Sequence, residues 1–141
     1  MVIITDEMRD LIDSALAERV PCLLGTASRE GHPQISIKGS MLVYDDQTLA
    51  YWERAGRTAK ANVAENPNVV VFYRNPERRI NWRFHGTAVL HESGPVRDGV
   101  MRKVVDAELD RDPDRLGAAV LVRVERIADL AGNIVQDGES P

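Results

Sequence analysis

The residues best suited to chemistry lie between Gly56 and Lys60, directly after a predicted strand and at the start of a predicted helix. A helix N-terminus exposes unpaired backbone N–H groups and the positive end of the helix dipole, so it favours a phosphate group. Arg57 would bind two phosphate oxygens, Thr58 would donate its hydroxyl, and Lys60 would add charge. The same residues also fit an ordinary capped helix with solvated cations, and both interpretations stay open.

Lys38 and two tryptophans are further candidates for a ligand site. Lys38 lies on the polar side of a predicted strand, between Ser36 and Ser40, and this side faces either solvent or a cleft. Trp52 and Trp82 are large enough to belong to the core, and either ring could instead stack on a planar ligand.

Four arginines fall within ten residues of an otherwise acidic chain: Arg74, Arg78, Arg79 and Arg83. They either keep a turn soluble and protect a strand edge from aggregation, or form a rim that attracts an anionic substrate or a cofactor phosphate.

Residues that would themselves perform catalysis are scarce. The three histidines lack the spacing of a metal site, and no motif marks Cys22 as a nucleophile. No GxSxG elbow or paired acid–base motif is present. A protein that binds a phosphate and a flat ring without its own acids and bases favours chemistry performed by a cofactor.

The hydrophobic pattern predicts six strands and three helices around these residues. Strands are expected at 22–28, 34–43, 48–53, 68–74, 79–91 and 118–130, and helices at 6–19, 57–65 and 95–110. In the second strand, Ile35, Ile37, Met41 and Val43 are expected to share one face. In the fifth strand, Gly86 is expected to mark a bulge or a close approach of another backbone. Close spacing of hairpin-linked strands favours a closed or nearly closed antiparallel barrel with helices packed outside.

The composition is that of one globular domain over residues 1–141, with 131–141 expected to be a flexible tail. The chain is 43% hydrophobic, carries a net charge of −4 and has a single cysteine. No apolar run approaches the ~20 residues that cross a bilayer, and the N-terminus becomes acidic too early for a secretory signal. We therefore expect a cytoplasmic protein that binds neither membranes nor nucleic acid.

The order of these elements resembles the pyridoxamine 5′-phosphate oxidase-like family of FMN-binding split β-barrels. The resemblance covers nearly the whole chain and is carried by motifs whose order and spacing match: residues 24–28, 31–36, 44–49, 57–63 with Asn66-Pro67, and 83–88. It implies a mainly β, six-stranded antiparallel split barrel and a homodimer that holds FMN in clefts along its interface.

The resemblance also implies site residues for the ring of the flavin. Ser36, Ile37 and Lys38 would line the ring, and Trp52 and Glu53 would lie near the ring or the ribityl chain. Asn81 falls where many family members place a polar residue toward the flavin.

For the phosphate, the resemblance implies contacts from Arg57 and Thr58, with Lys60 assisting. Counted back from Asn66-Pro67, the usual lysine of the family falls at Ala59, and Lys60 comes one position later. The chain also lacks the C-terminal arginine- and histidine-bearing segment with which the authentic oxidase binds its substrate, so oxidation of vitamin B6 is not expected.

The leading expectation is an FMN-dependent oxidoreductase that acts on an unidentified small molecule. One alternative is a non-catalytic FMN-binding module for electron transfer to a partner protein. Another is a reductase that uses the deazaflavin F420, whose acidic tail would bind the four arginines. Haem binding, as in haem-degrading relatives, is a weaker option because no histidine is suitably placed.

Overall fold

The computed structural model describes residues 1–54 and 58–138. The elements are, in chain order, α1 (Asp6–Asp13), β1 (Cys22–Ala27), β2 (Pro33–Lys38), β3 (Leu42–Asp45), β4 (Thr48–Glu53), α2 (Thr58–Glu65), β5 (Asn68–Asn75), β6 (Ile80–His91), α3 (Pro95–Lys103), α4 (Asp106–Leu109), β7 (Ala118–Ala128) and β8 (Ile134–Asp137).

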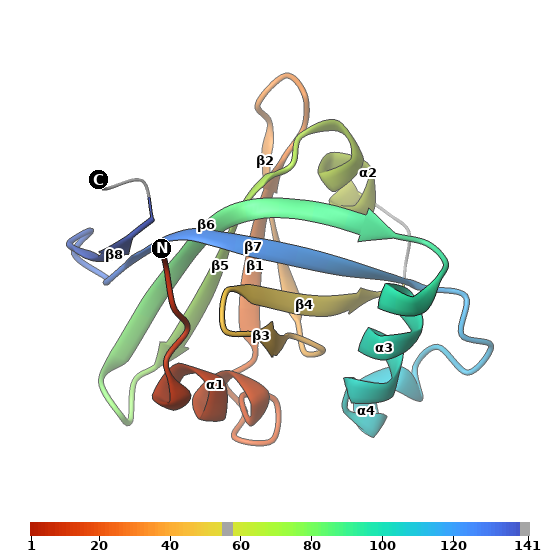
Figure 1. The fold of residues 1–141 in the computed structure, drawn as a ribbon, viewed down its shortest axis with the longest axis horizontal. Coiled ribbons are helices and arrows are strands. Elements are labelled where there is room, and N and C mark those ends of the chain that lie inside the picture. The colour runs from red at the N-terminus through yellow and green to blue at the C-terminus, as the bar shows by residue number, and fades with distance from the viewer. Residues whose placement is uncertain (55–57, 139–141) are drawn as a thin grey trace.

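The strands form one antiparallel sheet that curls around the core without closing. Their order is β2-β1-β5-β6-β7-β4-β3, and β8 adds to β7 outside this path. The long strands β6 and β7 run side by side through the middle of the sheet. In the view of Figure 1, α1 lies below these two strands and α2 lies above them. The open edges at β2 and β3 define a split barrel, so the predicted mainly β fold is confirmed.

Two buried clusters stabilise the sheet. The larger one fills the inside of the barrel and is covered by α1, whose first turn is capped where the Thr5 hydroxyl accepts a hydrogen bond from the Met8 amide. The smaller one packs the other face of β4 against α3, with Trp52 and Val100 among its members. Strand β4 is therefore buried on both faces, and successive side chains enter different clusters.

The segment 34–43 differs from its prediction as a single strand. A turn at Gly39 and Ser40 divides it into β2 and β3. Ile35 and Ile37 are 72% and 69% exposed, whereas Met41 and Val43 are 5% and 4% exposed. The prediction that these four side chains share one face is therefore wrong, because the turn ends the alternation on which it depended.

The number of elements also differs from the prediction. Among the described residues there are eight strands, because 34–43 forms two and because residues 134–137 of the expected tail form β8. The first helix ends at Asp13, and extended backbone at Val104 and Val105 divides the third into α3 and α4.

The bulge expected at Gly86 is confirmed by a shift in the β6–β7 register between His85 and Gly86. A Cβ atom at Gly86 would collide with the backbone carbonyl of Arg123, so the close approach of the two strands requires glycine. None of the helices in the described part of the chain is long and apolar enough to cross a membrane.

Candidate functional site

The predicted phosphate site lies at the start of α2, which begins at Thr58. The helix is held over β1 by a buried hydrogen bond in which the Asn62 amide donates to the Thr26 hydroxyl at 3.0 Å. Thr58 is exposed in the first turn, so its side chain is accessible to a ligand. The prediction for Arg57 falls outside the described residues.

Lys60 was predicted to assist in binding a phosphate, but in the structure it pairs with a carboxylate. Its Nζ forms an ion pair with Glu92 at 2.9 Å, and both side chains are partly exposed. Exposed pairs of this kind contribute only about 0–1 kcal/mol, so an anion at the helix could compete with Glu92 for the ammonium group.

Lys38 and Glu53 form a buried ion pair inside the open edge of the barrel. The Nζ atom of Lys38 lies 3.0 Å from Oε2 of Glu53, and the two side chains are 13% and 3% exposed. The ammonium also lies 5.3 Å from the centre of the Tyr51 ring. Lys38 is therefore turned inward, and the pair explains how β2 can direct a cation into the barrel.

Two polar atoms beside this pair lack hydrogen bonds. Oε1 of Glu53 and the hydroxyl of Tyr51 are buried and have no hydrogen-bond partner among the described residues. Burial, followed by the charge of Glu53, raises the pKa of Tyr51 well above its usual range. An unfilled donor and an unfilled acceptor next to a cation are suited to hydrogen-bonding groups of a ligand or to ordered water.

Trp52 faces away from this group, into the smaller cluster. Its Nε1 donates to Asp112 at 2.8 Å, and the guanidinium of Arg97 lies 4.9 Å from the ring centre. Burial raises the pKa of Asp112, but hydrogen bonds from Trp52 and from two backbone amides outweigh this effect, so the pKa is lowered. Of the two interpretations of the tryptophans, core packing fits Trp52, and Trp82 likewise stacks on Tyr73 with ring centres 5.5 Å apart.

The other residues predicted to lie near the flavin ring are spread over the fold. Ser36 is half-buried on the inner side of β2, and Ile37 points outward. Asn81 has a buried, unpartnered Oδ1 near the start of β6. Asn81 lies near the start of β6, whereas Glu92, the partner of Lys60, follows the end of the same strand, so roughly 35 Å of strand path lies between Asn81 and Glu92. A single chain therefore does not bring all the predicted residues together.

Two of the four clustered arginines, Arg83 and Arg78, bind other groups of the protein. Arg83 donates to the carbonyls of Asp129 and Leu130 at 2.8 and 2.9 Å, and its guanidinium lies over the Phe72 ring. Arg78 donates to Glu18 at 3.2 Å.

Sequence reasoning missed the outer face of β2, β1 and β5. The register aligns Ile37, Leu23 and Phe72 in one row across these strands, and Ile35, Gly25 and Val70 in the next. The alternation in β2 was visible in the sequence, but it did not indicate which of its two sides points outward.

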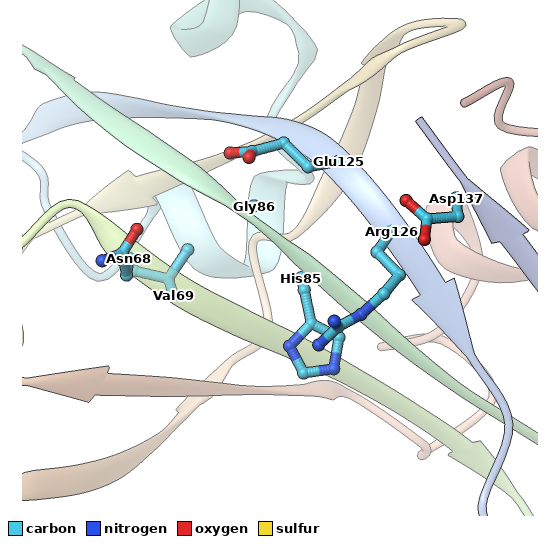
Figure 2. Close-up of a pocket in the computed structure, with 7 residues that line it drawn as sticks. All are labelled: Asn68, Val69, His85, Gly86, Glu125, Arg126 and Asp137. Carbon is cyan, nitrogen blue, oxygen red and sulfur yellow. The ribbon is translucent and has the colours of Figure 1, made fainter. Parts of the chain in front are cut away.

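Sequence reasoning also missed a cavity of about 270 Å³ on the same side of the sheet, next to the bulge. Figure 2 shows His85 and Arg126 projecting together from neighbouring strands at this cavity. The other lining residues are Asn68, Val69, Gly86, Glu125 and Asp137.

The histidines and the cysteine were predicted to form neither a metal site nor a nucleophile. Within residues 1–54 and 58–138, no group of histidine, cysteine and carboxylate side chains could hold a metal ion. Cys22 is fully buried, and burial raises its pKa to about 12. Its thiol is therefore protonated and inaccessible at neutral pH.

Comparisons with known proteins agree with this architecture. The family model for pyridoxamine 5′-phosphate oxidase matches residues 4–130. Group A Streptococcus HupZ is similar in structure, with 28% identity, a TM-score of 0.75 and coverage of 95% of this chain and 100% of that one.

Two further solved structures share the fold. A putative pyridoxamine 5′-phosphate oxidase from Lactobacillus delbrueckii is 24% identical, with a TM-score of 0.71 and coverage of 90% of this chain and 94% of that one. An FMN-binding protein from Syntrophomonas wolfei is 15% identical, with a TM-score of 0.68 and coverage of 88% and 86%. No curated protein matches the chain. Because the family match spans most of its length, the chain belongs to the pyridoxamine 5′-phosphate oxidase family.

Proposed function

We propose that this protein is an FMN-dependent oxidoreductase that acts on a small molecule, with FMN bound at the open edge of the barrel. The observation that carries the proposal is the buried Lys38–Glu53 pair with unfilled polar atoms beside it. Glu53 precedes the open N-terminus of α2 by only five residues. An ion pair with unfilled hydrogen-bonding atoms therefore precedes, by a short stretch of chain, a helix start suited to a phosphate.

The residues present fit the two ends of FMN. Thr58 and the first amides of α2 would hold the phosphate together with Arg57, and Lys60 would exchange Glu92 for it. Lys38 would bring a positive charge to the ring, while Glu53 keeps its ammonium in place. When bound, FMN supplies a ring that accepts and donates one or two electrons, which the side chains of this protein do not.

A second copy of the chain would complete the cleft. Ile35 and Ile37 expose most of their surface on an edge strand, and Leu23, Val70 and Phe72 extend this face across two more strands. Such a contiguous apolar face is typical of a protein interface. In a homodimer, Asn81 of one copy can approach the α2 end of the other, and its unpartnered Oδ1 could then accept a hydrogen bond from the ring.

Two alternative functions use the same cleft. An electron-transfer module would bind FMN without turning over a substrate of its own. A reductase using F420 is favoured by one solved structure of this fold, described as an F420 reductase, which is 16% identical with a TM-score of 0.60 and covers 77% of this chain and 89% of that one.

The visible spectrum of the purified protein after addition of FMN, F420 or haem separates these cofactors. Calorimetric titration with FMN then measures the affinity of the wild type and of Arg57→Ala. Because charge-assisted hydrogen bonds contribute about 1.5–3 kcal/mol, the variant should bind roughly 10- to 100-fold more weakly. Arg111→Ala, at an exposed arginine in the turn after α4, is the matched control.

An unchanged dissociation constant for Arg57→Ala would remove the phosphate assignment. Failure of the wild type to bind FMN at all would remove the proposed cofactor. Steady-state turnover with NAD(P)H and an artificial acceptor distinguishes an enzyme from an electron-transfer module.

A further inference from the structure

A second polar site lies on the outer face of the sheet, where β6 and β7 separate at their bulge. We propose that His85 and Arg126 bind the oxyanion group, carboxylate or phosphate, of a small molecule in the cavity next to them. This site goes beyond the proposed function, because it uses none of the residues assigned to FMN and requires no flavin.

The sheet places the two side chains directly opposite each other. His85 on β6 pairs with Arg126 on β7, and the register shift follows immediately at Gly86. On the other side of His85 stands Val70 of β5. Both polar side chains reach the same cavity of about 270 Å³, which Figure 2 shows between β5, β6, β7 and β8. This volume accommodates an oxyanion together with a body of several carbon atoms.

Neither side chain donates a side-chain hydrogen bond within residues 1–54 and 58–138. Among the described residues, none accepts a hydrogen bond from the Arg126 guanidinium, and none is hydrogen-bonded to the imidazole of His85. A guanidinium offers five N–H donors in a planar fork that matches a carboxylate or a phosphate, and a neutral imidazole offers one more.

The charges around His85 favour an anion. Burial lowers the pKa of His85, and the positive charges of Arg126 and then Arg83 lower it further. Two carboxylates also line the cavity. Glu125 accepts a hydrogen bond from the Thr87 hydroxyl, and Asp137 belongs to β8. Asp137 lies opposite Arg126 in the β7–β8 register, yet neither carboxylate raises the pKa of His85, whereas both guanidinium groups lower it.

The experiment follows the titration of each histidine by NMR in the flavin-free protein. The pH is varied in chloride, in inorganic phosphate and in succinate at matched ionic strength. An oxyanion about 5 Å from the imidazole should raise the pKa of His85 by about one unit, because it favours the charged form. His32, in an exposed turn, reports on nonspecific effects of the salts.

Arg126→Gln should abolish the rise in the pKa of His85. Arg123→Gln, which removes a guanidinium from the same strand, should leave the rise intact. The amide spectrum of each variant verifies that the fold is retained. A response to phosphate alone indicates a phosphorylated ligand, and a response to succinate alone indicates a carboxylic acid.

The proposal is overturned if the pKa of His85 is the same in all three salts, or if His32 shifts equally. A rise that appears in chloride as the protein concentration increases would mean that a carboxylate of a second copy occupies the site, and would also overturn it. Because Arg57→Ala leaves this measurement unaffected, failure of the proposed FMN site is distinguishable from failure of this one.

Discussion

The buried Lys38–Glu53 pair yields the most demanding prediction. Its two charges lie 3.0 Å apart with little exposure, so each neutralises the other in a poorly solvated place. Removing one partner leaves an uncompensated charge, which costs about 3–5 kcal/mol. We expect Glu53→Gln and Lys38→Met each to lower the free energy of unfolding by roughly 3 kcal/mol in the flavin-free protein.

The double variant distinguishes loss of the pair from loss of packing. With both charges removed, no buried ion remains unpaired, and such replacements are often neutral or stabilising. The double variant should therefore be more stable than either single variant, which corresponds to a coupling energy of more than about 3 kcal/mol between the two charges.

Urea unfolding followed by tryptophan fluorescence and by circular dichroism provides the assay. Glu18→Gln is the matched control, because the pair of Glu18 with Arg78 has a similar length of 3.2 Å but is exposed, and should cost less than about 1 kcal/mol. Additive effects of Glu53→Gln and Lys38→Met would refute the argument, since they would mean that the two charges do not stabilise each other.

Three further predictions concern other parts of the fold. The lowered pKa of Asp112 adds stability that is complete above its unfolded-state pKa of about 3.9 and is lost as the pH falls through the lower folded-state value. Asp112→Asn should therefore destabilise by about 1–3 kcal/mol at pH 7 but progressively less toward pH 3, as urea unfolding at each pH would record. Gly86→Ala should destabilise by about 3 kcal/mol or more by forcing β6 and β7 apart. Gly99→Ala in α3 should instead stabilise by up to about 1 kcal/mol, because the new Cβ would meet only the end of the Arg102 side chain at 3.9 Å; equal thermal shifts would contradict this. Ile37→Lys should dissociate the proposed homodimer in sedimentation experiments while keeping the monomer folded, and an unchanged sedimentation coefficient would place the interface elsewhere.

Local sequence patterns were sufficient for much of the fold. Strand β4 occupies the predicted residues 48–53, because β-branched and aromatic residues there are bounded by a turn and by a glycine. The end of α2 at Glu65 was likewise predictable from the Asn66-Pro67 that follows it. These elements follow from signals within a few residues of one another.

The face of β2 that enters the barrel was not predictable in this way. Alternation separates two sets of side chains, but the set that enters the barrel depends on partners far along the chain. Lys38 is accommodated inside by Glu53, fifteen residues later, and Gly39 lies where a side chain would collide with the carboxyl group of Glu108. The pairing of Lys60 with Glu92 was not predictable either, because Glu92 lies far along the chain from the first turn of α2.

The inverted pattern of β2 connects the proposed cofactor site with the proposed homodimer. Edge strands usually avoid association by directing charged side chains outward, and lysine is the commonest choice. Here the lysine of the edge strand points inward to Glu53, and isoleucines occupy the outer side. An edge built this way is unfavourable in an isolated monomer but favourable when another surface covers it. One arrangement of alternating residues therefore turns a cation toward Glu53 inside the barrel and an apolar face outward, so loss of the interface should weaken flavin binding as well.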